Sequence, residues 1–448
     1  MKHSLSFGRQ HGLTLIELMV AMVLGLLVAA GIVTVFASTS SSNKAQNQLA
    51  RLQEEGRFAI TRLSSDLSMA NGQYCTNSGG VAKPGTGGTY LDHLRTPKVY
   101  AKNLIGALGD VTTNWGATSG LTYPAAPTAS YSMPSFLFMR GYDCTLNACT
   151  PVDPHDYVAG IPAMGTTLNS RVKGSDVVTV RYVDPSAGWS IGAAGGSTIA
   201  TSSSVGTITS ITLKPLSNEP PASNFANGDL VMLADCSNAQ IFPASASSSV
   251  LTPSTNTTLV YTDSTPAAQQ PESAPSVFSV NRDLRTVTYY LKVVSVNNDG
   301  KAPFTGALMR RVNGAVAGHG GSEDELVRGV ERLDFKYGVQ DSSGKTSFLT
   351  AKQVDDSTAC PPQEISAVTT VGCLWRGVKS VEVSLLMDGQ LPLYTLAAND
   401  QQYRYSADDN TGLLAPSGHA IRPSDQGFPD QLLRREFTAL VAVRNYNP

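Results

Sequence analysis

One carboxylate lies inside the most apolar stretch of this chain. Residues 13–37 carry only apolar or small side chains, apart from Glu17, which is the one charged residue among them. A carboxylate in a membrane helix costs about 2.5–3.5 kcal/mol at the bilayer centre, and less near the interface. A cationic amine in the same low-dielectric layer stabilises such a carboxylate. We therefore interpret Glu17 as a functional residue that pairs with a positive charge.

The segment in front of this stretch has the features of a processing site. It contains no acidic residue, and its basic residues are Lys2, His3, Arg9 and His11. It ends in Gly12, directly before the apolar run. A secretory signal peptide has a shorter run, of about 7–15 residues, and its small-residue cleavage site follows that run. Two alternatives stay open: late cleavage near Ala37, and a plain signal anchor in which Glu17 is incidental.

Two consecutive helical segments position these residues. At ~1.5 Å per residue, residues 13–37 span roughly 37 Å as a helix, enough for a hydrocarbon core of ~30 Å. After residue 37, small and apolar residues recur every three to four positions, which predicts an amphipathic helix. These residues are Ala45, Leu49, Leu52, Gly56, Ala59, Leu63, Leu67 and Ala70. We place Arg62 and Asp66 off this stripe and expect them to pair weakly. Asn71 and Gly72 predict the end of the helix.

The rest of the chain has the pattern of a β-rich body. Short β-prone runs, several of them alternating, predict strands at 135–139, 176–183, 207–214, 230–233, 258–262, 277–280, 286–294, 308–312, 333–339, 378–387 and 436–443. Segments 79–89, 193–205 and 245–275, rich in Gly, Ser and Thr, predict long loops. The expected fold class is α+β: a long N-terminal helix, transmembrane in its first half and amphipathic in its second, packed on an antiparallel β-sheet head with long loops.

The six cysteines are expected to form disulfides outside the cytoplasm. Six cysteines allow fifteen pairings, which the sequence does not distinguish. Loop length favours Cys144 with Cys149 and Cys360 with Cys373, which leaves Cys75 with Cys236. Zinc is the rival interpretation, but the chain has no CxxC motif and its six histidines are scattered. We expect no metal and no cofactor.

Composition and motifs argue against an enzyme or a nucleic-acid-binding protein. The formal net charge is −2, and it becomes −4 without the Lys and Arg of residues 1–12, so no direct nucleic-acid partner is expected. Gly344, Lys345 and Thr346 end like a phosphate loop, but the glycine spacing is wrong and a hairpin turn explains them better. Residues 408–412 lack the alternating ligands of a calcium loop. We expect no catalytic residues.

The first residues resemble a known processing site. Gly12, followed by Leu13, Thr14, Leu15, Ile16 and Glu17, is similar to the start of type IV prepilins and type II secretion pseudopilins. The resemblance implies cleavage between Gly12 and Leu13 by the prepilin peptidase, with methylation of the new amine at Leu13. It also implies that Glu17 serves assembly by pairing with the N-terminal amine of a neighbouring subunit. Leu13 departs from the family, which more often has Phe there.

Four further segments narrow the resemblance. Residues 174–182, 228–242, 325–338 and 433–445 are similar to PilW-type minor pilins of the type IV pilus. This implies a minor pilin that helps to prime pilus assembly and joins the filament at its tip, with the helix in the core and the head against other minor pilins. The implied partners are minor and major pilins, the prepilin peptidase, the inner-membrane assembly platform and a PilY-type tip adhesin. Twitching motility and cell adhesion are implied for the filament.

The resemblance also implies a location and a division of the chain. Before assembly the protein would be a single-pass inner-membrane protein with a periplasmic head, and afterwards part of the pilus at the cell surface. The expected parts are a cleaved leader at 1–12, a transmembrane and filament-core helix at 13–37, its amphipathic continuation at 38–72, a first β-rich lobe at 73–275 and a second at 276–448. The alternatives are a J-type minor pseudopilin of type II secretion and a membrane-anchored adhesin or receptor.

Overall fold

The computed structural model describes most of the chain beyond the leader. The described residues are 14–72, 81–86, 88–92, 96–102, 104–113, 115–118, 121–122, 125–156, 160–184, 186–202, 208–234, 239–254, 275–341, 343–358, 372–392, 401–408 and 413–445.

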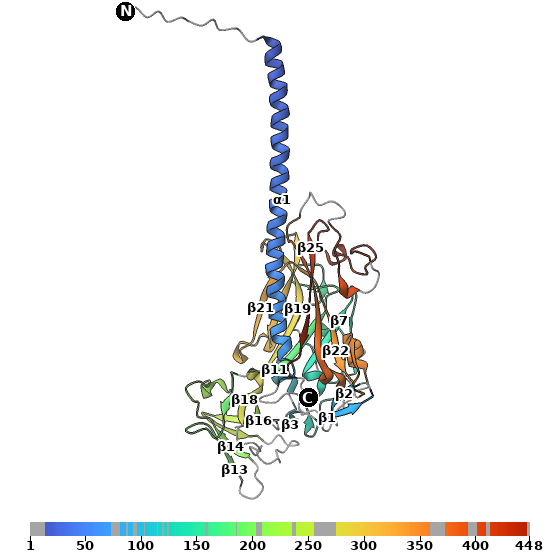
Figure 1. Ribbon diagram of the computed structural model, residues 1–448. Helices are drawn as coiled ribbons and strands as arrows, with labels where there is room; N and C mark the ends of the chain where they lie inside the picture. The colour runs from blue at the N-terminus through green and yellow to red at the C-terminus, as the bar shows by residue number, and fades with distance from the viewer. Residues whose placement is uncertain are drawn as a thin grey trace, which may run out of the picture.

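A single helix, α1 (Leu15–Met69), forms the axis of the molecule (Figure 1). It begins after Thr14, whose side chain and backbone cap the first turn together with Glu17. It ends where Asn71 adopts a positive φ of 62°, a conformation that asparagine tolerates. Its second half packs on the head through the predicted stripe, in which Leu52, Gly56, Ala59, Leu63, Leu67 and Ala70 are buried. The predicted long helix and its amphipathic second half are confirmed.

Two antiparallel sheets form the main body of the head. The first has the order β21-β20-β19-β11-β7-β8, with β9 and β10 beside it, and the second has the order β23-β22-β24-β25. The strands of the first are β7 (Met139–Cys144), β8 (Cys149–Thr150), β9 (Met164–Gly165), β10 (Arg171–Val172), β11 (Val177–Val183), β19 (Leu284–Ser295), β20 (Phe304–Val312) and β21 (Ser322–Arg328). Those of the second are β22 (Val330–Gln340), β23 (Thr346–Leu349), β24 (Val378–Asp388) and β25 (Arg434–Ala442). One core fills the space between the two sheets and α1, and α1 lies between β21 and β25 (Figure 1).

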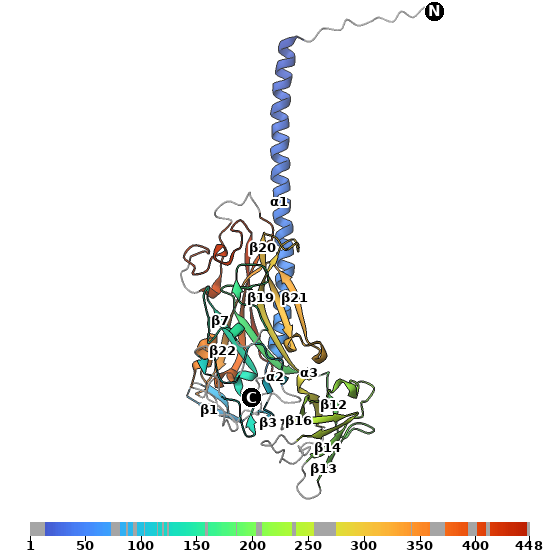
Figure 2. The same ribbon diagram turned by 180° about the vertical axis from the view of Figure 1, so that it is seen from behind.

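A third sheet builds a smaller lobe at the end of the head farthest from the apolar half of α1 (Figure 2). Its order is β12-β18-β15-β16-β17-β14-β13, with β3 and β6 beside it. The strands are β3 (Lys98–Val99), β6 (Tyr131–Ser132), β12 (Trp189–Ser190), β13 (Thr198–Thr201), β14 (Ile208–Thr212), β15 (Leu230–Ala234), β16 (Ala239–Ser247), β17 (Val250–Pro253) and β18 (Ser276–Ser279). This distal lobe has a core of its own, around Trp189, Val231 and Phe242.

Smaller elements complete the described structure. Two short hairpins consist of β1 (Val81–Gly85) with β2 (Gly88–Asp92), and β4 (Ala117–Thr118) with β5 (Leu121–Thr122). The short helices are α2 (Leu104–Ala107), α3 (Val280–Asp283) and α4 (Ala351–Asp356).

Several strand and loop predictions differ from the structure. Residues 135–137 form a 3-10 helix after Pro134, and the strand begins only at Met139. The segments predicted as loops at 79–89, 193–205 and 245–275 contain β1, β13 and β17, because exposed strands of Ser, Thr and Ala lack an apolar alternation. The predicted strand at 258–262 lies outside the described residues.

The boundary placed at residue 275 does not separate two sheets. β11 pairs with β19 from Val178 with Tyr289 to Val183 with Leu284, and β15 pairs with β18. Both pairings join strands from the two sides of residue 275, so the two lobes as delimited at 73–275 and 276–448 share sheets. The division seen in the structure instead separates the distal lobe from the main body.

Candidate functional site

The first turn of α1 places Glu17 next to the residue that follows the predicted cut. The N–H and the hydroxyl of Thr14 donate to Oε2 of Glu17 at 3.0 and 2.9 Å, and the N–H of Glu17 donates to the Thr14 hydroxyl at 3.3 Å. The other carboxylate oxygen, Oε1, accepts no hydrogen bond from the described residues, and the side chain is exposed. This reciprocal cap needs an oxygen-bearing side chain at each end of the turn, which Thr14 and Glu17 supply. Gly12 and Leu13 lie outside the described residues.

The helix beyond this cap presents apolar side chains on all sides. Its most apolar window has a mean hydropathy of 2.7, and none of that window is buried in the head. Leu15, Met19, Leu27, Ile32 and Phe36 are among the exposed side chains. An apolar surface of this extent is stable in lipid or against other apolar helices, because water does not solvate it favourably. Within the described part of the chain, α1 is the one helix long and apolar enough to cross a membrane.

A buried carboxylate joins the second half of α1 to the head. Oδ1 of Asp66 accepts a hydrogen bond from the Tyr182 hydroxyl at 2.8 Å, and Oδ2 accepts one from the Tyr289 hydroxyl at 2.6 Å. Nε and Nη2 of Arg310 donate to the same carboxylate at 2.7 and 3.3 Å. Burial raises the pKa of Asp66, but the hydrogen bonds and charge of Arg310, with both tyrosines, outweigh it, so the pKa lies below its usual value. One side chain of α1 thus binds three neighbouring strands, β11, β19 and β20.

The sequence argument missed this network. Asp66 was placed off the apolar stripe and paired with Arg62, whereas the structure buries it and pairs it with Arg310. The signal was present, because Asp66 follows Leu63 by three positions and therefore shares its face. An arginine inside the apolar strand β20 was the second signal. A buried charge requires an opposite charge, and these two lie on adjoining elements.

Two further contacts fix the position of α1. At Gly56, an added Cβ would lie 2.5 Å from the ring of Phe437 on β25, so only glycine permits this approach. At the end of the helix, Nδ2 of Asn445 donates to the carbonyls of Met69 and Ala70 at 2.9 and 3.1 Å. The C-terminal strand and the residues after it therefore hold the second half of α1.

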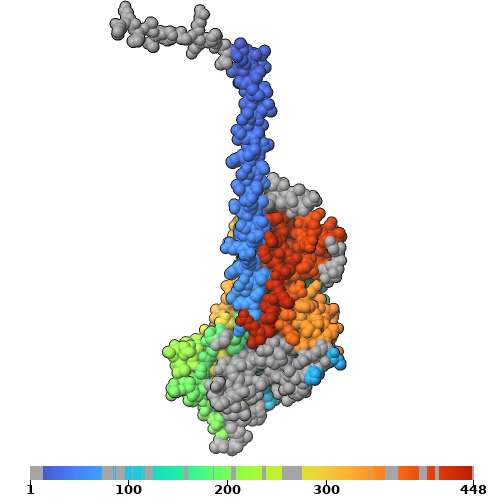
Figure 3. Space-filling model, viewed as in Figure 1, coloured from blue at the N-terminus to red at the C-terminus, as the bar shows by residue number. Residues whose placement is uncertain are grey.

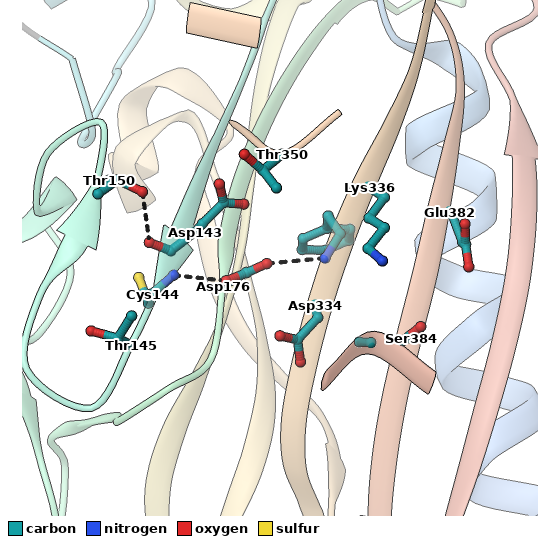
Figure 4. A pocket seen from close by; sticks show the side chains of 12 residues that line it. Asp143, Cys144, Thr145, Thr150, Asp176, Asp334, Lys336, Thr350, Glu382 and Ser384 are labelled. Atoms are coloured by element: carbon teal, nitrogen blue, oxygen red, sulfur yellow. Dashed lines mark hydrogen bonds between the residues drawn. The ribbon is translucent and has the colours of Figure 1, made fainter. Parts of the chain in front are cut away.

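A polar cavity between the two sheets of the main body contains three carboxylates (Figure 4). It has a volume of about 180 Å³, and the carboxylates belong to Asp143, Asp176 and Asp334. Asp176 accepts the N–H groups of Cys144 at 2.8 Å and Phe335 at 3.0 Å, so it bridges the end of β7 and β22. Burial, with the charges of Asp334 and Asp143, raises the pKa of Asp176 well above its usual value. The arrangement connects the two sheets.

No catalytic or metal-binding geometry accompanies these carboxylates in the described residues. No group of three or more His, Cys, Asp or Glu side chains there could hold a metal ion. Asp408, from the rejected calcium loop, instead accepts hydrogen bonds from Arg332 at 2.8 and 3.1 Å and contacts His419 at 3.0 Å. Asp341 accepts the N–H groups of Ser343 and Lys345, which closes the turn between β22 and β23.

The structure describes three of the six cysteines. Cys144 and Cys149 are joined in a disulfide, which is the pair favoured by loop length. Cys373 is also disulfide-bonded. Cys75, Cys236 and Cys360 lie outside the described residues, so the pairs Cys75–Cys236 and Cys360–Cys373 stay predictions.

An N-terminal helix with an exposed apolar first half, a Glu in its first turn and a β-sheet head on its second half define a pilin-like protein. Comparison with known families agrees with this class. Residues 8–33 match the prokaryotic N-terminal methylation motif, and residues 288–445 match the family described as type IV pilus-assembly protein W. The second match covers strands from β19 to β25 and includes Arg310. No curated protein and no solved structure was found to match.

The two matches support a PilW-type type IV pilin. This family is structural, and membership implies interaction with other pilus components. The apolar helix and the methylation motif fit a membrane-anchored pilin.

Proposed function

We propose that this protein is a minor type IV pilin that helps to prime pilus assembly and is incorporated at the tip of the filament. The observation that carries the proposal is the form of α1. Its apolar half is exposed, while its second half is held rigidly in the head by the Asp66 network and the Gly56 contact. Such a helix can leave the bilayer and enter a bundle of similar helices without any refolding of the head.

In this proposal the protein first spans the inner membrane, with its basic leader in the cytoplasm and its head in the periplasm. The prepilin peptidase then cuts between Gly12 and Leu13 and methylates the amine of Leu13. Glu17 accepts hydrogen bonds from Thr14 within its own chain, and its Oε1 accepts none from the described residues. That oxygen is available to the N-terminal amine of a neighbouring subunit, and this pairing sets the axial position of the subunit in the filament.

The head contacts other minor pilins, and a PilY-type tip adhesin and the inner-membrane platform are further partners. Twitching motility and adhesion then belong to the filament as a whole. The distal lobe lies at the end of the head away from the apolar half of α1 (Figure 2), the end that a tip subunit would expose.

Processing and assembly test this proposal separately. The N-terminal peptide of the protein recovered from its own membranes should begin at Leu13 and carry one added methyl group. Glu17→Ala should abolish or strongly reduce surface pili while leaving the protein at normal levels in the membrane, and Thr14→Ser, which keeps the hydroxyl, is the matched control. A peptide beginning at Met1 in cells with active prepilin peptidase would contradict the proposal. A silent Glu17→Ala would favour the membrane-anchored receptor, and loss of secretion instead of pili would favour the J-type pseudopilin.

A further inference from the structure

A single aromatic side chain interrupts the charged face of α1. Phe58 is 52% exposed, although it lies on the part of the helix that the head already covers on its other side. Among the described residues of α1 after Phe36, it is the one large hydrophobic side chain that is exposed. Its neighbours on the surface are Glu54, Arg51 and Arg57, all exposed. An exposed phenylalanine among charges loses free energy in water and gains it on contact with a partner.

Phe58 lines a groove between α1 and the edge strand β21. The groove has a volume of about 520 Å³, and its walls are Arg51, Glu54, Glu55 and Phe58 from α1 and Glu325, Leu326, Val327 and Arg328 from β21. On the other side of α1, β25 lies directly against the helix (Figure 3), with Phe437 packed on Gly56. A second element can therefore approach this part of α1 on the β21 side.

The charges of the groove are nearly balanced, with one exception. Arg51 pairs with Glu55 at 2.7 Å, and Arg328 pairs with Glu325. Glu54 forms no ion pair with any of the described residues. Glu54 and Phe58 are four residues apart, so they lie on one face of the helix, one turn from each other. The groove thus presents an apolar anchor beside an uncompensated carboxylate.

We infer that this groove receives the helix of another pilin subunit, one that places an apolar side chain on Phe58 and a lysine or arginine opposite Glu54. The inference rests on the proposed function and names the surface through which it acts. Its argument is the continuity of α1: the helix runs unbroken from Leu15 to Met69, and Phe58 lies about 33 Å along it from Phe36. A neighbouring helix that covers the apolar half and runs along α1 continues into this groove. The free carboxylate selects a basic residue on that helix.

Site-specific photo-crosslinking in piliated cells tests the inference. The photoreactive amino acid p-benzoylphenylalanine replaces Phe58 in one strain and Phe348 in the other. Phe348, on β23, is a matched control because it is a phenylalanine of nearly equal exposure, 51%. Position 58 should form an adduct with another pilin, identified by mass spectrometry, and position 348 should not form that adduct. Glu54→Lys in the position-58 strain should lower the adduct yield about two- to fivefold, as expected for an exposed ion pair.

The outcomes separate this inference from the proposed function. If the protein is absent from sheared pili in both strains and in wild type, the proposed function fails. If the protein is present in pili but position 58 gives no pilin adduct, or the same adducts as position 348, the groove is not the docking surface. An adduct at position 58 with a second copy of this chain, or with a protein that is not a pilin, also overturns the inference.

Discussion

Replacing Arg310 with methionine should destabilise the head, because it leaves the buried carboxylate of Asp66 without its charge partner. The two side chains are only 7% and 4% exposed, and Arg310 supplies two of the four hydrogen bonds to that carboxylate. Removing one partner of a buried ion pair costs about 3–5 kcal/mol. We therefore expect Arg310→Met to lower the free energy of unfolding by that amount, measured by urea denaturation of the full-length protein in detergent.

A surface pair of the same protein is the control. Lys352 and Asp356 pair on α4 but are 54% and 53% exposed, so Lys352→Met should change the free energy of unfolding by less than about 1 kcal/mol. Asp66→Asn combined with Arg310→Met should be less destabilised than the sum of the single variants, with a coupling energy of about 2 kcal/mol. A cost below about 1 kcal/mol for Arg310→Met, or a coupling energy near zero, would refute the role assigned to this pair.

The same pair fixes the sign of a pH effect. Because the pKa of Asp66 in the folded protein lies below its ordinary value of 3.8, its ionised form stabilises the fold above pH 3.8. This contribution is lost as the pH falls through the folded-state pKa. Without Arg310 the pKa of Asp66 rises, so acid unfolding of Arg310→Met should begin at a higher pH than that of wild type.

Three further predictions concern other contacts of the head. Gly56→Ala should lower the free energy of unfolding by about 1–3 kcal/mol through contact with the Phe437 ring, and Phe437→Leu in the same chain should recover part of it; equal stability of Gly56→Ala and wild type in urea would contradict this. Burial and the charge of Glu331 raise the pKa of Asp388 to about 7, so its contribution to stability falls as the pH rises from about 4 to 7. Asp388→Asn should flatten that part of the urea-midpoint profile, and an unchanged slope would count against it. Replacing Cys144 and Cys149 with serine should lower the free energy of unfolding by about 2 kcal/mol, as estimated from the short loop that they close; an unchanged urea midpoint would show that the disulfide does not stabilise the head.

The sequence by itself determined the long helix and the chemistry of its first turn. The hydrogen bonds of a helix are local, so the apolar run, the stripe from Leu52 to Ala70 and the stop at Asn71 could be read from spacing alone. The same holds for strands with a clear apolar content, such as β11 and β19. It does not hold for β13 and β17, whose Ser- and Thr-rich sequences carry no such signal.

Only the tertiary structure decided which distant residues meet. Asp66 and Arg310 are 244 positions apart, and neither residue type names its partner. The pairing of β11 with β19 across the boundary at residue 275, and the approach of Phe437 to Gly56, have the same origin. Strand pairing and buried ion pairs depend on the order in which strands lie side by side, and that order is set by the packing of the whole core rather than by local sequence.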